Sequence, residues 1–417
     1  MAFQRNQKND PSSERDGKRI LLITPRFPFP VIGGDKLRVY NIVKYLSNFY
    51  SFTLASLYST DEEESAMPEQ GIFDEVYRIR QSKLASYWYT AGNLIRGRSL
   101  QSGYFYNPKF KRLINSKLSG HDLVFAHLIR VSDYVWGKGV PGICEMTDAI
   151  SMNYERAGAA GGRSLRKYIY RFEHKRCLDS ERRCLDGFDG CVVVSPTDRD
   201  YLTDRYPQYS SKMHVIPNGV RAEDFPYRRE KVSADKIVFI GNMRTFQNAD
   251  AACYFAREVF PGIKQRRPGA AFWVVGADPG KEVRSLASIP GVVVTGRVDD
   301  VRAHAHDAAA SVCPVRIGAG IQNKVLESMA MGIPVVTTAV GAEGILGRNG
   351  RHFTVADSPN ELRAGVMDIL TDRSKAEAFS KNGRALVEER YSWEGMLRSY
   401  RDLIESVLNG AGECRPQ

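Results

Sequence analysis

Hydrophobic residues form short, continuous runs along the chain. In the stretches between these runs, single hydrophobic residues recur at helical spacing. Continuous runs are typical of parallel strands that are covered on both faces, because neither face then needs polar side chains. The pattern predicts strands at Arg19–Thr24, Phe52–Tyr58, Leu123–Ala126, Gly142–Met146, Gly190–Val194, Lys236–Ile240, Ala271–Val275, Gly291–Val294, Ala310–Cys313, Pro334–Thr337 and His352–Val355. It predicts helices at Lys36–Ser47, Asn248–Arg266, Gly320–Met331, Asn360–Leu370 and Arg373–Glu389. Strands that alternate with helices in this way indicate an α/β protein with doubly wound, Rossmann-like sheets.

The predicted elements divide into two similar halves. One strand stops at the Pro-Asn-Gly turn of Ile216–Val220, which favours a domain boundary nearby. We therefore expect a disordered tail over residues 1–17, a first domain over 18–221, a second domain over 222–391, and a last helix within 392–417 that crosses back to the first domain. Ligands of doubly wound sheets bind beyond the carboxyl ends of the strands, so two facing domains would form an inter-domain cleft.

Composition and charge narrow the class of protein. The 417 residues are 43% hydrophobic, which is ordinary for a folded chain and excludes a collagen or a small disulfide scaffold. No apolar run approaches the roughly 20 residues of a membrane-spanning helix, and residues 1–17 lack the apolar core of a signal peptide. Seven irregularly spaced cysteines favour reduced thiols in the cytoplasm. The net charge of +11 suits nucleic acid, anionic lipid or phosphorylated substrates, but also a solvated basic surface.

The strongest candidate for chemistry lies between Arg316 and Glu327, where a strand ends, a glycine-rich turn follows and a helix begins. Free N–H groups at a helix start bind anions, and glycine lets the backbone approach a phosphate closely. Arg316 and Lys324 add positive charge beside the turn. Glu327, one helical turn beyond Asn323, can accept two hydrogen bonds from a vicinal diol such as ribose. The alternative is an ordinary strand-to-helix connection with a surface Glu–Lys pair.

Several strings of the sequence resemble a known family. Ile216–Val220, the run Lys324–Val336 and the turn Thr338–Gly344 are similar to the glycosyltransferases of family 4 (group 1), which have the GT-B fold. More specifically, Arg316–Ala330 and Gly291–Val301, together with Phe239–Asn248, resemble sugar transferases associated with bacterial exopolysaccharide and PEP-CTERM systems. The resemblance covers about residues 18–410 and is strongest in the second half.

The resemblance implies an activity. It implies a retaining glycosyltransferase that moves a sugar from a nucleotide-diphosphate-sugar to a hydroxyl of a lipid-linked saccharide, in the synthesis of exopolysaccharide or another surface glycan. A soluble small molecule or a protein is the alternative acceptor. Neither a cofactor nor a metal is expected, because the Asp-x-Asp triplet at Asp198–Asp200 follows Ser195-Pro196 and more naturally opens a helix.

The resemblance also assigns donor-binding residues. Glu327 matches the second Glu of the family's E-x7-E motif and would bind the ribose, whereas the first Glu is replaced by Ala319. The remaining donor contacts are expected in two glycine loops, in the turn before the helix that carries Glu327 and in the turn beside the nucleobase, together with nearby cations. These residues are Gly33, Gly34, Gly241, Arg244, Arg297, Val298, Arg316, Gly318, Gly320, Ile321 and Lys324. Asp35 and Asp299 are expected to cap the helices that follow their turns.

The family's usual catalytic histidine is missing. After the strand Gly142–Met146 the chain reads Thr147-Asp148, so Asp148 is the side chain best placed to contact a sugar hydroxyl or to stabilise positive charge at the anomeric carbon. His127, at the end of the preceding strand, is the alternative catalytic residue, although a lone histidine there is more often structural.

Two other function classes compete with this interpretation. A dinucleotide-dependent oxidoreductase would need a Gly-x-Gly-x-x-Gly motif after the first strand, and the chain lacks one there. A nucleic-acid binder would suit the positive charge, but no known nucleic-acid module is visible, and we expect no nucleic-acid partner.

One segment, residues 82–115, mixes aromatic side chains with lysine and arginine. This mixture suits a membrane interface, where rings lie at the depth of the headgroups and cations meet anionic lipid. We therefore expect a cytoplasmic protein that can bind peripherally to the inner face of an anionic membrane. The alternative is that Tyr87–Tyr89 and Tyr104–Tyr106 pack within a helical subdomain.

Overall fold

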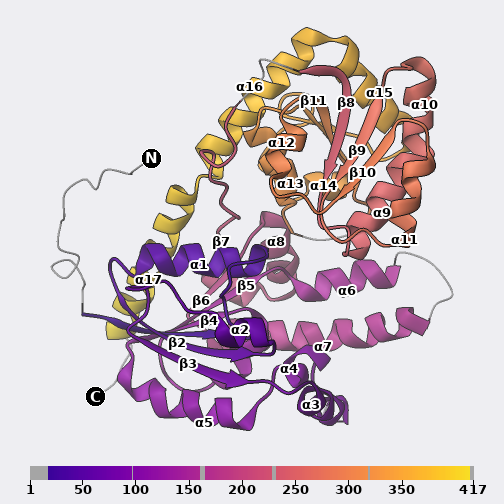
Figure 1. Cartoon of the computed structure of the whole chain (residues 1–417). Helices are drawn as coiled ribbons and strands as arrows, with labels where there is room; N and C mark the ends of the chain where they lie inside the picture. The colour runs from indigo at the N-terminus through magenta and orange to yellow at the C-terminus, as the bar shows by residue number, and fades with distance from the viewer. Residues whose placement is uncertain (1–16, 96, 160–164, 228–231, 318–319, 414–417) are drawn as a thin grey trace.

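The structure, a computed structural model, describes residues 17–95, 97–159, 165–227, 232–317 and 320–413. Residues 1–16 of the predicted tail and the candidate site residue Gly318 lie outside the described residues. The described chain forms two parallel β-sheets, each flanked by helices, and Figure 1 shows these as two domains joined by the linker after β7 and by the last helix. The α/β fold with two Rossmann-like domains is therefore confirmed.

The first domain is built on a seven-stranded sheet of order β3-β2-β1-β4-β5-β6-β7, in which every neighbouring pair is parallel. The central strands are almost entirely buried, because helices cover both faces. The strands are β1 Arg19–Thr24, β2 Ser51–Tyr58, β3 Glu75–Arg80, β4 Leu123–His127, β5 Gly142–Thr147, β6 Gly190–Val193 and β7 Met213–Val215. Sequence analysis missed β3, since this edge strand is only half-buried and alternates polar with apolar residues.

Helices of the first domain fall into two groups around this sheet. One hydrophobic cluster joins α1 to one face, and a second joins α5 and α7 to the other. The helices are α1 Gly34–Leu46, α2 Asp61–Ser65, α3 Lys83–Ile95, α4 Leu100–Tyr104, α5 Pro108–Lys117, α6 Ile150–Ala159, α7 Leu165–Gly187 and α8 Pro196–Arg205. As predicted, α8 is opened by Ser195, whose Oγ accepts a hydrogen bond from the N–H of Asp198.

The second domain has a six-stranded sheet of order β10-β9-β8-β11-β12-β13, again parallel throughout. Its strands are β8 Ser233–Ile240, β9 Ala271–Val275, β10 Val292–Gly296, β11 Ala308–Cys313, β12 Val335–Thr337 and β13 Thr354–Val355. Its helices are α9 Phe246–Tyr254, α10 Phe260–Arg266, α11 Lys281–Ser285, α12 Val301–Ala305, α13 Asn323–Ala330, α14 Ala339–Ala342, α15 Pro359–Thr371 and α16 Arg373–Arg390. The predicted helix over 248–266 is divided by a π-helical turn, Phe255–Val259.

The last helix, α17 Trp393–Glu413, returns from the second domain to the side of the first, where it packs against α1 (Figure 1). Its buried side chains join the cluster that α1 forms on one face of the first sheet: Met396, Leu397, Tyr400, Leu403, Ile404 and Val407. The six described cysteines are buried and unbridged, as the sequence predicted.

A single buried arginine ties these parts together. Arg38 on α1 donates from Nε to Oε1 of Glu145 on β5 at 2.8 Å. Its Nη1 donates to the carbonyl oxygen of Pro217 at 3.0 Å and to Oδ1 of Asn218 at 2.7 Å. Its Nη2 donates to the carbonyl oxygen of Ile216 and to the Tyr400 hydroxyl. All five N–H groups of the guanidinium are therefore used, on three different segments.

Replacing Arg38 should destabilise the fold strongly. The change Arg38→Met leaves Glu145 buried without its cation, and loss of one partner from a buried pair costs about 3–5 kcal/mol. The matched control is Lys44→Ala on the same helix, whose ion pair with Glu69 is about half exposed and should cost less than about 1 kcal/mol. Urea denaturation would measure both free energies of unfolding, and equal losses would contradict the special role of Arg38.

Candidate functional site

The carboxyl ends of the two sheets face each other. Asp148, just after β5, lies so close to Gly320, in the turn before α13, that a Cβ on Gly320 would be 2.6 Å from Oδ1 of Asp148. Gly320 also has a φ of +75°, a conformation that favours glycine. Nearby, Nδ2 of Asn218 donates to Oδ1 of Asn323 at 2.9 Å, so the linker contacts the first residue of α13. The structure thus brings together the sequence candidates Asp148 and Gly320.

Helix α13 presents Lys324 and Glu327 beside this junction. Its apolar residues Val325, Leu326 and Met329 are buried in the core of the second domain, which fixes the orientation of the helix. Lys324 Nζ donates to Oε1 of Gln322 at 2.9 Å and forms no ion pair with Glu327. Ile321 is buried in the same core and anchors the turn.

The carboxylate of Glu327 is half-buried, and no hydrogen bond to it is found among the described residues. Burial raises its pKa, which the nearby charge of Lys324 opposes. A desolvated carboxylate without donors is costly, so its free lone pairs mark it as a group that a ligand can satisfy.

Arg316 is placed differently from the other cations of this motif. Its Nη2 and Nε donate to the two carboxylate oxygens of Asp250 on α9 at 2.6 and 3.1 Å. Its guanidinium also lies 4.3 Å from the ring centre of Tyr254. Asp250 therefore already compensates the charge of Arg316.

The loop after β8 is closely packed at its base and open at its tip. A Cβ on Gly276 would lie 1.8 Å from the carbonyl oxygen of Gly241, so glycine is required where β9 passes this loop. Arg244 is exposed at the tip, and its backbone N–H donates to Oδ1 of Asn242 at 3.0 Å. Its guanidinium forms no ion pair within the described part of the chain.

The turn after β10 carries Arg297 and Val298. The side chain of Arg297 is 76% exposed and lies 3.8 Å from Asp278, whereas Val298 packs against the apolar cluster around Ile240. The expected helix cap is wrong by one residue. Asp300, not Asp299, accepts the N–H of Arg302 at 2.9 Å, because α12 begins only at Val301.

The glycine loop of the first domain directly precedes α1. Gly33 has a φ of +102° and is itself the residue before the helix, with Gly34 as its first residue. Asp35 was expected as the cap, but it lies inside the first turn and approaches Arg26 at 3.9 Å instead. The carboxylate still lies at the positive end of the helix, where negative charge is favourable.

Asp148 occupies an unusual electrostatic position. Burial raises the pKa of its carboxyl to about 7, and the negative charges of Asp198 and Glu145 add to this effect. The preceding residue, Thr147, has a φ of +70°, which is strained for a β-branched side chain. Backbone strain at Thr147 and the energetically unfavourable carboxylate of Asp148 therefore lie next to each other at the end of β5.

His127 lies inside the buried network rather than at its surface. It is 3% exposed, and its Nδ1 is hydrogen-bonded to Oε2 of Glu145, which also pairs with Arg38. Burial alone would raise the pKa of Glu145, but Arg38 and His127 lower it to about 2. Glu145 is therefore an anion that His127 and Arg38 share.

Sequence analysis gave no role to several charged residues near this junction. Arg156 on α6 makes a two-pronged ion pair with Glu343 of the second domain, with distances of 2.5 and 2.6 Å. Arg130, just after β4, half-buried and close to Asp148, was also missed. Only the position of Arg130 after a buried strand could have indicated it. In the ranges that the structure describes, no group of three or more His, Cys, Asp or Glu residues could hold a metal ion.

The charge of Asp148 should be visible in stability. Since the folded-state pKa is raised, the folded protein holds a proton that the unfolded chain releases, and stability falls as the pH rises from about 4 to about 7. Asp148→Asn should therefore raise the melting temperature more at pH 8 than at pH 5.5. We expect a difference of roughly 2–4 °C, the effect of about 1 kcal/mol in a domain of this size.

The exposed Asp200 on α8 provides the matched control, because Asp200→Asn should give the same small change at both pH values. An equal effect of Asp148→Asn at the two pH values would contradict the raised pKa.

Comparison with known proteins agrees with this geometry. The model of Glycosyltransferase Family 4 matches residues 39–224, and that of Glycosyl transferases group 1 matches residues 234–372, one in each domain. The chain is 31% identical over 249 residues to a GDP-mannose-dependent alpha-(1-6)-phosphatidylinositol monomannoside mannosyltransferase of Mycobacterium tuberculosis. This match covers 54% of the chain and 63% of the relative, so the chain spans less than two thirds of that protein's length.

Solved structures show the same fold at low sequence identity. Sucrose-phosphate synthase from Thermosynechococcus elongatus superposes with a TM-score of 0.72 at 16% identity, over 94% of this chain and 100% of that one. HepE of Anabaena in complex with UDP-glucose gives a TM-score of 0.64 at 14% identity, over 93% of this chain and 99% of that one. With the two family models covering most of the chain, one in each domain, the protein belongs to the group 1, family 4 glycosyltransferases and has their GT-B fold.

Proposed function

We propose that the protein transfers a sugar from a nucleoside-diphosphate sugar to a hydroxyl group of an acceptor, with retention of configuration and without a metal ion. The observation that carries this proposal is the half-buried carboxylate of Glu327, which has no donor among the described residues and stands beside Lys324. A ribose supplies the two hydroxyl donors that such a carboxylate lacks. The Anabaena structure that shares the fold holds UDP-glucose.

The diphosphate of the donor would lie at the start of α13. No described side chain caps the start of this helix, and its positive end favours an anion. Lys324 adds a full positive charge, and the exposed Arg244 can add a second from the loop after β8. These groups would stabilise the charge that develops on the leaving diphosphate, which is the role a metal ion has in other transferases. Contributions of Arg316, Arg297 and Gly33 remain predictions.

The transferred sugar would then lie between the start of α13 and Asp148 of the first domain. In the reaction, the bond from the anomeric carbon to the diphosphate oxygen breaks, and the acceptor oxygen forms a new bond to that carbon. The acceptor proton passes to the departing diphosphate. Asp148 would orient a sugar hydroxyl, and in its ionised form it would stabilise positive charge at the anomeric carbon. His127, held by Glu145, would support the floor of the site.

A lipid-linked acceptor is the second part of the proposal. Leu84, Trp88 and Ile95 on α3 are 83%, 78% and 88% exposed, and at 100° per residue they fall within an arc of about 40°. Lys83 at the start of this helix and Arg98 just after its end are exposed, and Lys111 is exposed on α5. Apolar residues flanked by cations suit the surface of an anionic membrane. The mycobacterial relative is named for a phosphatidylinositol acceptor.

The alternative interpretation of this segment holds for some of its aromatic residues. The rings of Tyr87 and Tyr104 meet at 6.0 Å, and those of Tyr89 and Tyr106 at 5.0 Å, so they pack α3 onto its neighbours. None of the helices in the described ranges is both long and apolar enough to cross a membrane. We therefore propose peripheral binding through α3, at the inner face of a bacterial membrane where an exopolysaccharide or another surface glycan is assembled.

Glu327→Gln should lower the affinity for UDP or GDP, whichever the wild type binds. The loss should be roughly ten- to a hundredfold, because hydrogen bonds to a charged group contribute about 1.5–3 kcal/mol. Lys324→Ala should weaken binding of the nucleoside diphosphate but leave the affinity for the nucleoside unchanged. Isothermal titration calorimetry measures both, with the exposed Glu377→Gln as the matched control. Wild-type affinity in Glu327→Gln would overturn the donor assignment.

Membrane binding should depend on the apolar stripe of α3. The double variant Leu84→Ser, Ile95→Ser should reduce co-sedimentation with anionic vesicles by at least about tenfold, since burial of each side chain contributes about 1.5–3 kcal/mol. Leu346→Ser, which removes an exposed leucine from the second domain, is the control and should bind as the wild type does. Negligible wild-type binding to anionic vesicles at low salt would favour a soluble acceptor.

A further inference from the structure

Three neighbouring strands of the first sheet are each followed by a charged residue on the side that faces the second domain. Arg26 follows β1, Arg130 follows β4 and Asp148 follows β5, and these strands are adjacent in the order β1-β4-β5. The carboxyl ends of adjacent parallel strands lie at one edge of the sheet, so the two arginines stand beside the proposed catalytic carboxylate. The charges of Arg26 and Asp148 both act on Arg130, which places all three in one electrostatic environment.

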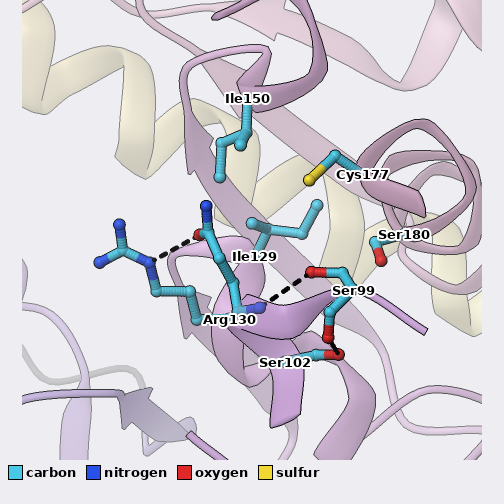
Figure 2. Close-up of a pocket in the computed structure, with 8 residues that line it drawn as sticks. Ser99, Ser102, Ile129, Arg130, Ile150, Cys177 and Ser180 are labelled. Carbon is cyan, nitrogen blue, oxygen red and sulfur yellow. Dashed lines mark hydrogen bonds between the residues drawn. The ribbon is translucent and has the colours of Figure 1, made fainter. Parts of the chain in front are cut away.

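One aromatic ring holds the two arginines. The guanidinium of Arg130 lies 5.5 Å from the ring centre of Phe105, and that of Arg26 lies 5.9 Å from the same centre. Nε of Arg130 donates to Oε1 of Gln101 at 3.2 Å, as Figure 2 shows. The small pocket drawn there has a volume of about 10 Å³, enough for no more than a water molecule, and the guanidinium points away from Ser180 and Cys177 on its far side.

Arg130 has no described carboxylate in direct contact. It forms no ion pair in the described parts of the chain, and its two terminal nitrogens donate no hydrogen bond there. Burial lowers the pKa of Arg130 and the nearby positive charge of Arg26 lowers it further, whereas the charges of Asp35 and Asp148 act in the opposite direction. Asp35 lies 3.9 Å from Arg26 but forms no ion pair with Arg130, so an anion in contact with Arg130 would further offset these two like charges on one ring.

The surface beside Arg130 is a pocket of about 340 Å³ that no element fills. Trp88, Tyr89 and Tyr106 contribute aromatic surface, and Arg98 and Lys111 add positive charge at its wall. Among the described residues that line it, Asp133 alone is acidic, and it lies 3.7 Å from Arg183. Aromatic faces with cations suit a sugar that carries a negative group.

We propose that Arg130, assisted by Arg26, binds an anionic group of the acceptor close to the accepting hydroxyl, and that the adjoining aromatic pocket holds the next part of the same molecule. The anionic group is a phosphate or diphosphate, as at the head of a lipid-linked saccharide, or the carboxylate of an acidic sugar. This inference rests on the proposed function, because it takes Asp148 as the position of transfer.

Thermal-shift titration of the full chain tests the site. The probes are inorganic phosphate, inorganic pyrophosphate and glucuronate at constant ionic strength, with glucose as the neutral control. UDP and GDP are present in parallel samples to occupy the donor wall. At least one anion should raise the wild-type melting temperature saturably in the presence of nucleotide, and glucose should not. A larger saturable shift with phosphate or pyrophosphate indicates a phosphorylated acceptor. A larger shift with glucuronate indicates an acidic sugar.

Arg130→Gln should lower the affinity for that anion by roughly ten- to a hundredfold, the loss expected for hydrogen bonds to a charged group. Arg26→Gln, at an exposed position, should weaken binding of the anion to a smaller extent, and Arg130→Lys should restore part of the affinity. Lys138→Gln, an exposed cation in the loop before β5, is the control. Unchanged anion affinity in both glutamine variants, or no saturable anion effect in the wild type, would overturn the proposal.

The two proposals can fail separately in this experiment. If neither UDP nor GDP binds, the donor assignment falls, while the difference between wild type and Arg130→Gln still decides the anion site. If nucleotide binds but no anion does, the donor site stands and the anionic acceptor is refuted.

Discussion

The arrangement of the two domains depends on one buried ion pair, between Arg38 and Glu145. Arg38 uses every N–H group it has, and its partners lie on β5, on the linker at 216–218 and on α17. A buried guanidinium with this geometry admits few alternative positions for its partners, because each lost bond leaves a desolvated donor. The linker is therefore fixed relative to α1, and through Asn218 and Asn323 it is also fixed relative to the start of α13.

The same ion pair shapes the chemistry of the candidate site. Glu145 stays ionised because Arg38 and His127 compensate it, and its negative charge then helps to raise the pKa of Asp148. A carboxyl whose pKa lies near neutrality can exchange a proton at physiological pH, which an ordinary aspartate cannot. The network thus lowers the stability of the ionised form of Asp148 at the place where the two domains meet. Strain at Thr147 is found at the same position, as is common at functional sites.

The fold could be predicted from the sequence far better than the site. Strands such as β1 and β11 are continuous apolar runs, and their period and length are local properties of the chain. The edge strand β3 lacks that signal and was missed. The motif around Glu327 was visible because its residues lie within one turn and one helix. The contacts of Arg38 join residues 107 and 362 positions apart, and the environment of Arg130 combines three strands, so no local pattern indicates either.

The net charge of +11 is informative about ligands only when the partners of the individual cations are known. Arg316 forms an ion pair with Asp250, and Arg156 forms one with Glu343. Because these charges are compensated within the protein, they are weak evidence for a ligand. Lys324, Arg244 and Arg130 form no ion pair in the described chain, and each lies just after the carboxyl end of a strand or at the start of a helix. Burying a cation costs less when an anion accompanies it, so the half-buried Lys324 and Arg130 support the proposed path of a negatively charged substrate more specifically than the overall charge does. In the proposed function this path runs from the start of α13, past Asp148, to the ring of Phe105, and the donor and the acceptor would then have separate sets of cations.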